Sequence, residues 1–172
     1  MNGKLKRIEG RPALRFERSL SHPVERVWRA ITDPDELEAW FVARVDWTPE
    51  VGETFEAMGE RGEVTDVDPP NLLAWRWGGE LFRFELRVGD GGCLLTFTHV
   101  FDDRRFGAQH ATGWELTFQR LEAVLAGSPL TEEESMEGFA ELHERYASSF
   151  GLDSEVGRRA FAAHRAGQTP EH

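Results

Sequence analysis

The sequence has little cysteine, a shortage of basic residues and no long apolar run. A single cysteine, Cys93, among 172 residues excludes a disulfide framework and favours a cytoplasmic protein. The formal net charge of -11 disfavours binding to phosphate backbones and anionic lipids, so we expect neither a nucleic-acid partner nor a membrane partner. No stretch reaches the roughly 20 apolar residues of a membrane span, and the segment MNGKLKRIEG lacks the apolar core of a signal peptide.

The sequence also lacks the clusters on which most metal and catalytic sites depend. No two histidines have metal-ligand spacing, so we expect no zinc, iron or other cofactor. The glycine-rich segment 89–92 joins two expected strands and has no lysine of a phosphate-binding loop. Asp102 and Asp103 are typical of a charged turn, with acid–base catalysis as the weaker alternative. We therefore assign no catalytic residue and favour a protein that is not an enzyme.

Short alternating segments, separated by turn residues, predict an antiparallel sheet. The expected strands are residues 14–21, 53–58, 62–67, 72–77, 81–88 and 93–101, with a weaker candidate at 42–47. Two short helices should follow the first strand, because Pro23 suits a first helical position and Asp33 can cap the second helix.

A long helix is predicted after the last strand. Large apolar residues recur at intervals of four, three and four positions and so form one stripe: Trp114, Phe118, Leu121 and Leu125. Gly113 lies inside this helix, where a missing side chain would let the helix approach the sheet closely. The helix should end at Gly127, and an amphipathic helix over 132–149 and a weaker one over 154–166 should follow.

This order of elements resembles a known family. The matching segments are PVERVWRAITDPDELEAWF (23–41), GEVTDVDPPNLLAWRWGG (62–79), LTFTHVFDD (95–103) and GWELTFQRLEAVLAG (113–127). They resemble the START-like, or SRPBCC (Bet v 1-like helix-grip), superfamily, and within it the bacterial branch similar to the heat-shock-protein-90 ATPase activator homologue. The resemblance implies an α+β helix-grip fold, in which a curved antiparallel sheet of about six or seven strands wraps around a long C-terminal helix.

The resemblance also implies a cavity between the sheet and the long helix. Aromatic residues that alternation and helical spacing turn toward each other are either plain core or the lining of that cavity, and the resemblance favours a lining. We expect His99 to be the main polar contact and the mouth to lie near Trp40 and Phe41. The complete set of expected ligand-binding residues is Trp40, Phe41, Phe55, Trp75, Trp77, Phe84, Phe97, His99, His110, Trp114 and Phe118.

Three functions fit this arrangement. The first is binding of a small hydrophobic or aromatic molecule without covalent chemistry. The second is a cyclase- or dehydratase-like enzyme that uses the same cavity, with His99, His110 or an acidic residue at the rim as an acid–base group. The third is a stress-related protein that regulates a chaperone. We expect a flexible N-terminus (1–12), one helix-grip domain (13–127) and a helical C-terminal tail (128–172), through which a protein partner could bind. From Thr131 onward this tail should be an appendage and not part of the core.

Overall fold

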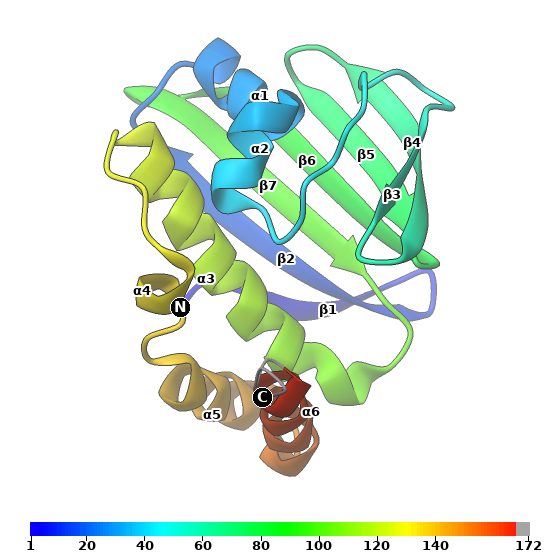
Figure 1. Cartoon of the computed structure of the whole chain (residues 1–172), viewed down its shortest axis with the longest axis vertical. Helices are drawn as coiled ribbons and strands as arrows, with labels where there is room; N and C mark the ends of the chain where they lie inside the picture. The colour runs from blue at the N-terminus through cyan, green and yellow to red at the C-terminus, as the bar shows by residue number, and fades with distance from the viewer. Residues whose placement is uncertain (168–172) are drawn as a thin grey trace, which may run out of the picture.

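A computed structural model describes residues 1–167 and shows a curved seven-stranded sheet that wraps around one long helix (Figure 1). The strands are all antiparallel and lie in the order β1-β2-β7-β6-β5-β4-β3. Their bounds are β1 (Lys4–Ile8), β2 (Arg11–Leu20), β3 (Thr54–Ala57), β4 (Glu60–Asp68), β5 (Leu72–Trp77), β6 (Glu80–Gly89) and β7 (Gly92–Val100). The predicted helix-grip class is confirmed, and the long helix crosses the concave face of the sheet.

The helices also follow the predicted order. They are α1 (Val24–Thr32), α2 (Pro34–Trp40), the 3-10 turn η1 (Arg104–Phe106), α3 (Gly107–Leu125), α4 (Glu132–Ser135), α5 (Phe139–Phe150) and α6 (Ser154–Gly167). The Asp33 carboxylate accepts a hydrogen bond of 2.9 Å from the Asp35 backbone N–H and so caps α2 as expected. None of the helices within residues 1–167 is both long enough and apolar enough to cross a membrane.

The weak strand candidate at 42–47 is wrong. The segment is irregular, although Val45 and Trp47 are buried on the core side. The indole N–H of Trp47 donates to the Thr32 carbonyl at 3.0 Å, and its ring packs edge-on against Trp75. Alternating burial arises here from packing against the core and not from pairing with a neighbouring strand.

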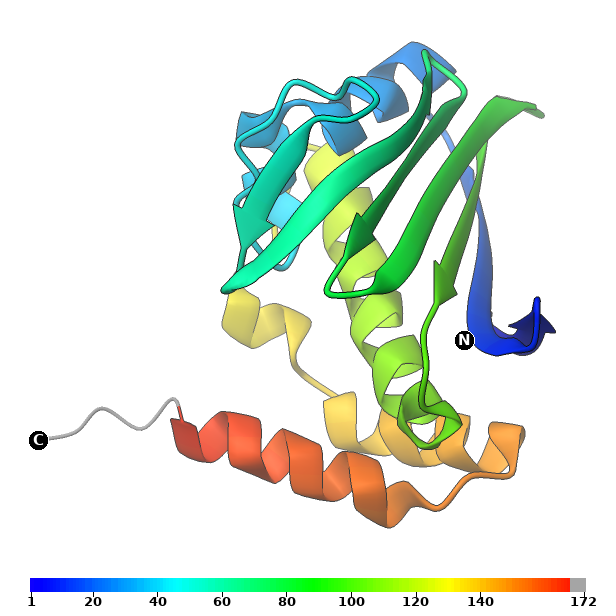
Figure 2. The same ribbon diagram turned by 90° about the vertical axis from the view of Figure 1, so that its right-hand side faces the viewer.

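The tail differs from its prediction in two ways. The single helix expected over 132–149 is divided into α4 and α5, because Gly138 adopts a left-handed φ of 75° between them. The tail is also not separate from the core, since Tyr146 is fully buried within it. Figures 1 and 2 show α5 and α6 packed at the end of the molecule where α3 begins.

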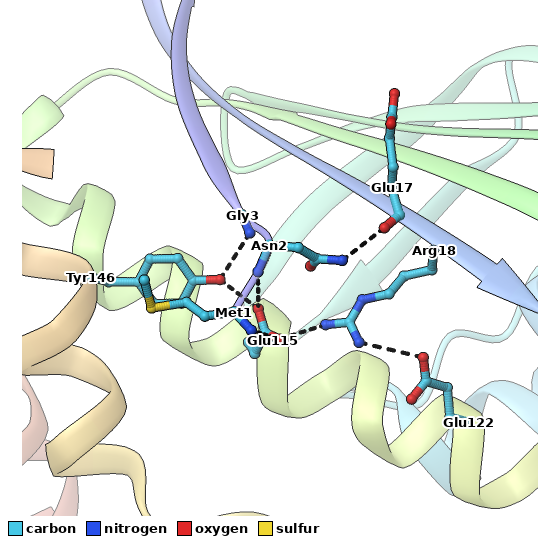
Figure 3. Close-up of polar contacts among 8 residues, drawn as sticks. All are labelled: Met1, Asn2, Gly3, Glu17, Arg18, Glu115, Glu122 and Tyr146. Carbon is cyan, nitrogen blue, oxygen red and sulfur yellow. Dashed lines mark hydrogen bonds and ion pairs between the residues drawn. The ribbon is translucent and has the colours of Figure 1, made fainter. Parts of the chain in front are cut away.

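A buried polar cluster joins the N-terminus, the long helix and the tail (Figure 3). The Tyr146 hydroxyl donates to the Glu115 carboxylate and accepts a hydrogen bond of 2.9 Å from the Gly3 N–H. Arg18 donates to the other Glu115 oxygen at 2.8 Å. Burial alone would raise the pKa of Glu115, but the Tyr146 hydrogen bond and the Arg18 charge hold that pKa below its ordinary value. Residues 1–12, expected to be a flexible segment, thus contribute strand β1 and a contact to the tail.

The aromatic core lies between the sheet and α3, as the sequence predicts. Register places Phe82 opposite His99 and Phe84 opposite Phe97 on neighbouring strands. Leu121 of the α3 stripe is only 1% exposed, so the helix turns this face toward the sheet. These contacts fix which side chains can reach the concave face.

Candidate functional site

A pocket of about 550 Å³ opens beside the first half of α3, at one end of the sheet. Its sheet wall consists of the end of β5, the start of β6 and His99 of β7. The tail closes another side with three apolar side chains, Met136, Phe139 and Phe161. Val42 and Met58, which are 51% and 69% exposed, lie at the rim. The pocket is therefore mostly apolar and is built by sheet, long helix and tail together.

Gly113 provides part of the open space. A Cβ atom built on this residue would meet no other atom within 4 Å, and the residue itself lines the pocket. The close approach of helix and sheet that we expected at Gly113 is wrong. The missing side chain instead leaves open space in the pocket.

A histidine–carboxylate pair forms the polar end of the pocket. The indole N–H of Trp114 donates to Nδ1 of His99 at 3.1 Å, so Nδ1 must act as the acceptor. We therefore assign the ring proton to Nε2, which lies 2.6 Å from Oε2 of Glu80 and donates to it. His99 is 2% exposed and stacks on Phe82 with ring centroids 4.4 Å apart. Both ring nitrogens of His99 are thus occupied, and Glu80 presents the charge.

His110 is the second histidine of the site. Its ring packs edge-on against His99 and Phe101, at centroid distances of 5.0 and 4.9 Å. Within residues 1–167 its imidazole makes no hydrogen bond. Burial is the main cause that lowers the pKa of His110, to about 4, so the ring is neutral at physiological pH.

The structure brings four of the eleven expected ligand residues to the pocket surface: Trp77, His99, His110 and Trp114. Four others are at most 1% exposed and lie behind that surface, in the packed core: Trp40, Phe84, Phe97 and Phe118. The remaining three, Phe41, Phe55 and Trp75, belong to an adjoining aromatic cluster that includes Trp47. The mouth was expected near Trp40 and Phe41, and the next residue, Val42, does lie at the rim. The Trp40 and Phe41 side chains themselves are 0% and 6% exposed and lie in the core.

Sequence reasoning missed several residues of the pocket. Phe82 shares the inward face of β6 with Phe84, so alternation was sufficient to find it. Glu80 follows the Gly78–Gly79 turn, where a polar residue is typical of solvent-exposed loop. Phe139 and Phe161 belong to tail helices whose packing site on the domain has no signal in the sequence.

Among the smaller pockets of the described residues, one of about 330 Å³ lies between α5 and α6. It contains no residue of the sheet or of α3, so it does not match the cavity that the fold predicts. Among the described residues, no group of three or more His, Cys, Asp or Glu side chains is placed to hold a metal ion.

Comparisons with known proteins agree with this architecture. The family model described as "Activator of Hsp90 ATPase homolog 1-like protein" matches residues 21–126. The crystal structure of CalU16 from Micromonospora echinospora is 23% identical, with a TM-score of 0.70 over 86% of this chain and 95% of that chain. EF2215 from Enterococcus faecalis, a conserved protein of unknown function, is 18% identical, with a TM-score of 0.73 over 87% and 90%.

A further solved structure comes from a biosynthetic context. DynU16, described as a putative protein in the dynemicin biosynthetic locus, is 27% identical, with a TM-score of 0.61 over 68% of this chain and 48% of that chain. No curated protein matches the sequence.

Proposed function

This chain belongs to the family of proteins like the activator of Hsp90 ATPase homolog 1, and we propose that it binds a small hydrophobic or aromatic molecule in the pocket beside α3. The observation that carries the proposal is the pocket itself, which combines aromatic walls and a mostly apolar surface with one polar end. Its volume of about 550 Å³ lies within the range typical of small-molecule sites. Binding needs no covalent chemistry from the protein.

Two further features support this function. The helix-grip superfamily that the sequence resembles includes hydrophobic-ligand carriers. DynU16 is described as part of a biosynthetic locus, a setting in which binding of a small molecule has an obvious use. Likeness of fold alone does not identify a ligand, so the argument depends on the pocket.

A cyclase- or dehydratase-like enzyme is the second candidate, and one observation favours it. His110 is a neutral imidazole at the pocket with no hydrogen bond to the described residues, so its nitrogens are available to a bound molecule. His99 is less suited to proton transfer, because Trp114 and Glu80 occupy its two nitrogens. Conversion of a bound ligand that ceases in His110→Gln, with binding retained, would favour the enzyme over the carrier.

Regulation of a chaperone is the function that the family description suggests. It requires a protein-docking face and does not depend on an empty pocket. A stress-related role of this kind and the small-molecule role are therefore separable by a variant that fills the pocket and leaves the surface unchanged.

The test uses Gly113→Leu, which places a large side chain in the open space. Isotope-labelled protein is titrated with a panel of neutral aromatic and aliphatic molecules, and the indole N–H signals of Trp77 and Trp114 are followed by NMR. We expect saturable shifts at these indoles and a loss of affinity of about tenfold or more in Gly113→Leu. The control is Ala126→Leu, which introduces the same leucine side chain at an exposed position at the end of α3. Equal binding by both variants, or shifts confined to other parts of the protein, would contradict the proposal.

A further inference from the structure

We propose that the ligand of this pocket is an apolar cation, a hydrophobic molecule with one protonated amine that lies against Glu80. This inference rests on the proposed function and adds the charge class of the ligand. It follows from the charges that line the pocket, from the tautomer of His99 and from the aromatic walls.

The pocket has acidic groups and no basic one to balance them. Glu60 and Glu80 are the charged side chains among its lining residues, and no lysine or arginine of the described chain is among them. Glu60 makes no ion pair with any described residue. Arg11 donates to the nearby Gly79 carbonyl at 3.2 Å, but its charge is paired with Asp102 at 2.8 Å. The Arg165 guanidinium lies 5.9 Å from the ring centroid of Phe161 but does not line the pocket. A ligand carboxylate would therefore face two glutamates with no basic side chain among the described lining residues.

The pair formed by His99 and Glu80 carries a net negative charge. A protonated histidine would neutralise Glu80, but both ring nitrogens would then be donors. Nδ1 of His99 instead accepts the Trp114 N–H, so the ring holds one proton and is neutral. The Glu80 carboxylate accepts from His99 through Oε2 and makes no other hydrogen bond to the described residues. The side chain is 28% exposed and lines the pocket, and its Oε1 atom accepts no hydrogen bond from the described residues.

The walls of the pocket suit a cation as well as they suit an apolar body. The rings of Trp77, Phe82, Trp114, Phe139 and Phe161 line the space. Phe82 is already stacked on His99 and Trp75, and Phe161 already carries the Arg165 guanidinium, so the other three rings are the candidates for contact with a cation. The negative face of an aromatic ring attracts an ammonium group, and tryptophan attracts it best. His110 adds no opposing charge, because burial keeps its ring neutral. The aromatic walls and the carboxylates of Glu60 and Glu80 thus both favour a positively charged ligand.

The experiment uses three molecules with one naphthalene body and different charge: 2-naphthylmethylamine, 2-naphthylmethanol and 2-naphthoate. Dissociation constants are measured by calorimetry at neutral pH and low salt, with the Trp77 and Trp114 indole signals as the reporters of site. We expect the amine to bind about tenfold more tightly than the alcohol and the carboxylate to bind least.

Glu80→Gln tests the assigned residue. The glutamine amide oxygen can still accept from His99, so the fold and the pocket shape are kept while the charge is removed. We expect this variant to lose most of the preference for amine over alcohol and to bind the alcohol as before. Glu85→Gln is the matched control, because Glu85 lies on the same strand, on the outer face of the sheet.

The outcomes separate this inference from the proposed function. Equal affinities for the three molecules, or tightest binding of the carboxylate, would overturn the cation inference and leave small-molecule binding standing. An amine preference that persists in Glu80→Gln would overturn the role of Glu80. Both proposals would be overturned if neither these three molecules nor any member of the neutral panel shifted the indole N–H signals of Trp77 and Trp114.

Discussion

Replacing Gly113 with alanine should make the protein more stable, because the residue lies inside α3 and has no neighbour to clash with. Glycine in a helix interior costs about 1 kcal/mol relative to alanine, since its backbone loses more freedom on folding. A Cβ atom at this position would meet nothing within 4 Å. The gain from helix propensity is therefore not opposed by overpacking, and it should appear almost in full.

Urea unfolding followed by circular dichroism measures this gain directly. We expect the free energy of unfolding to rise by about 1 kcal/mol in Gly113→Ala, and the melting temperature to rise by about 2–4 °C for a chain of this size. Gly107→Ala is the control on the same helix. Its Cβ would lie 3.3 Å from the Leu152 side chain and 3.4 Å from that of Leu5, so a smaller gain is expected.

The result that refutes this reasoning is a loss of stability in Gly113→Ala. It would mean that the side chains around Gly113 pack more closely than the structure has them, and that the space beside α3 is filled. The proposed pocket would then lose the feature that gives it room.

Three further predictions concern stability. The pKa of His110 is lowered from 6.5 to about 4 in the folded protein, so the stability that the neutral ring contributes is complete above pH 6.5 and is lost as the pH falls toward 4. The free energy of unfolding, measured with urea, should therefore fall by up to about 3 kcal/mol over this window. In His110→Gln the free energy of unfolding should depend less on pH between these two values. Tyr146→Phe should cost about 1.5–3 kcal/mol in the same assay, because it removes the hydrogen bond to the buried Glu115 carboxylate, and an unchanged midpoint would count against the cluster. Leu121→Ala should cost about 2–5 kcal/mol, and a change under half a kcal/mol would place the side chain in solvent.

The sheet and the long helix were predictable because their signals are local. Turn residues divide the chain between strands, and alternation then sets the face of each side chain, as in the inward set that contains Phe84 and Phe97. The α3 stripe likewise follows from helical spacing. Which of these inward residues line a pocket and which fill the core could not be predicted, since that depends on the depth of each position beneath its neighbours.

The polar end of the pocket depends on contacts that no local pattern encodes. His99 was expected to point inward, and it does, but its tautomer is set by Trp114, fifteen residues away in sequence. Its hydrogen-bond partner Glu80 begins a strand after a glycine turn, where the sequence favours a solvent-exposed position. Only the register between β6 and β7, with Phe82 opposite His99, brings this carboxylate to the histidine.

The tail shows why a boundary drawn from sequence and a boundary drawn from packing can differ. Gly127 ends α3, and the segment that follows looks like an appendage because its apolar stripe has no partner that the sequence identifies. In the structure Tyr146 reaches Glu115 in the middle of α3, while Phe139 forms a wall of the pocket. The same helix thus holds the tail to the domain and encloses the proposed ligand, so a mutation that loosens the Tyr146 contact should weaken ligand binding without touching the pocket itself.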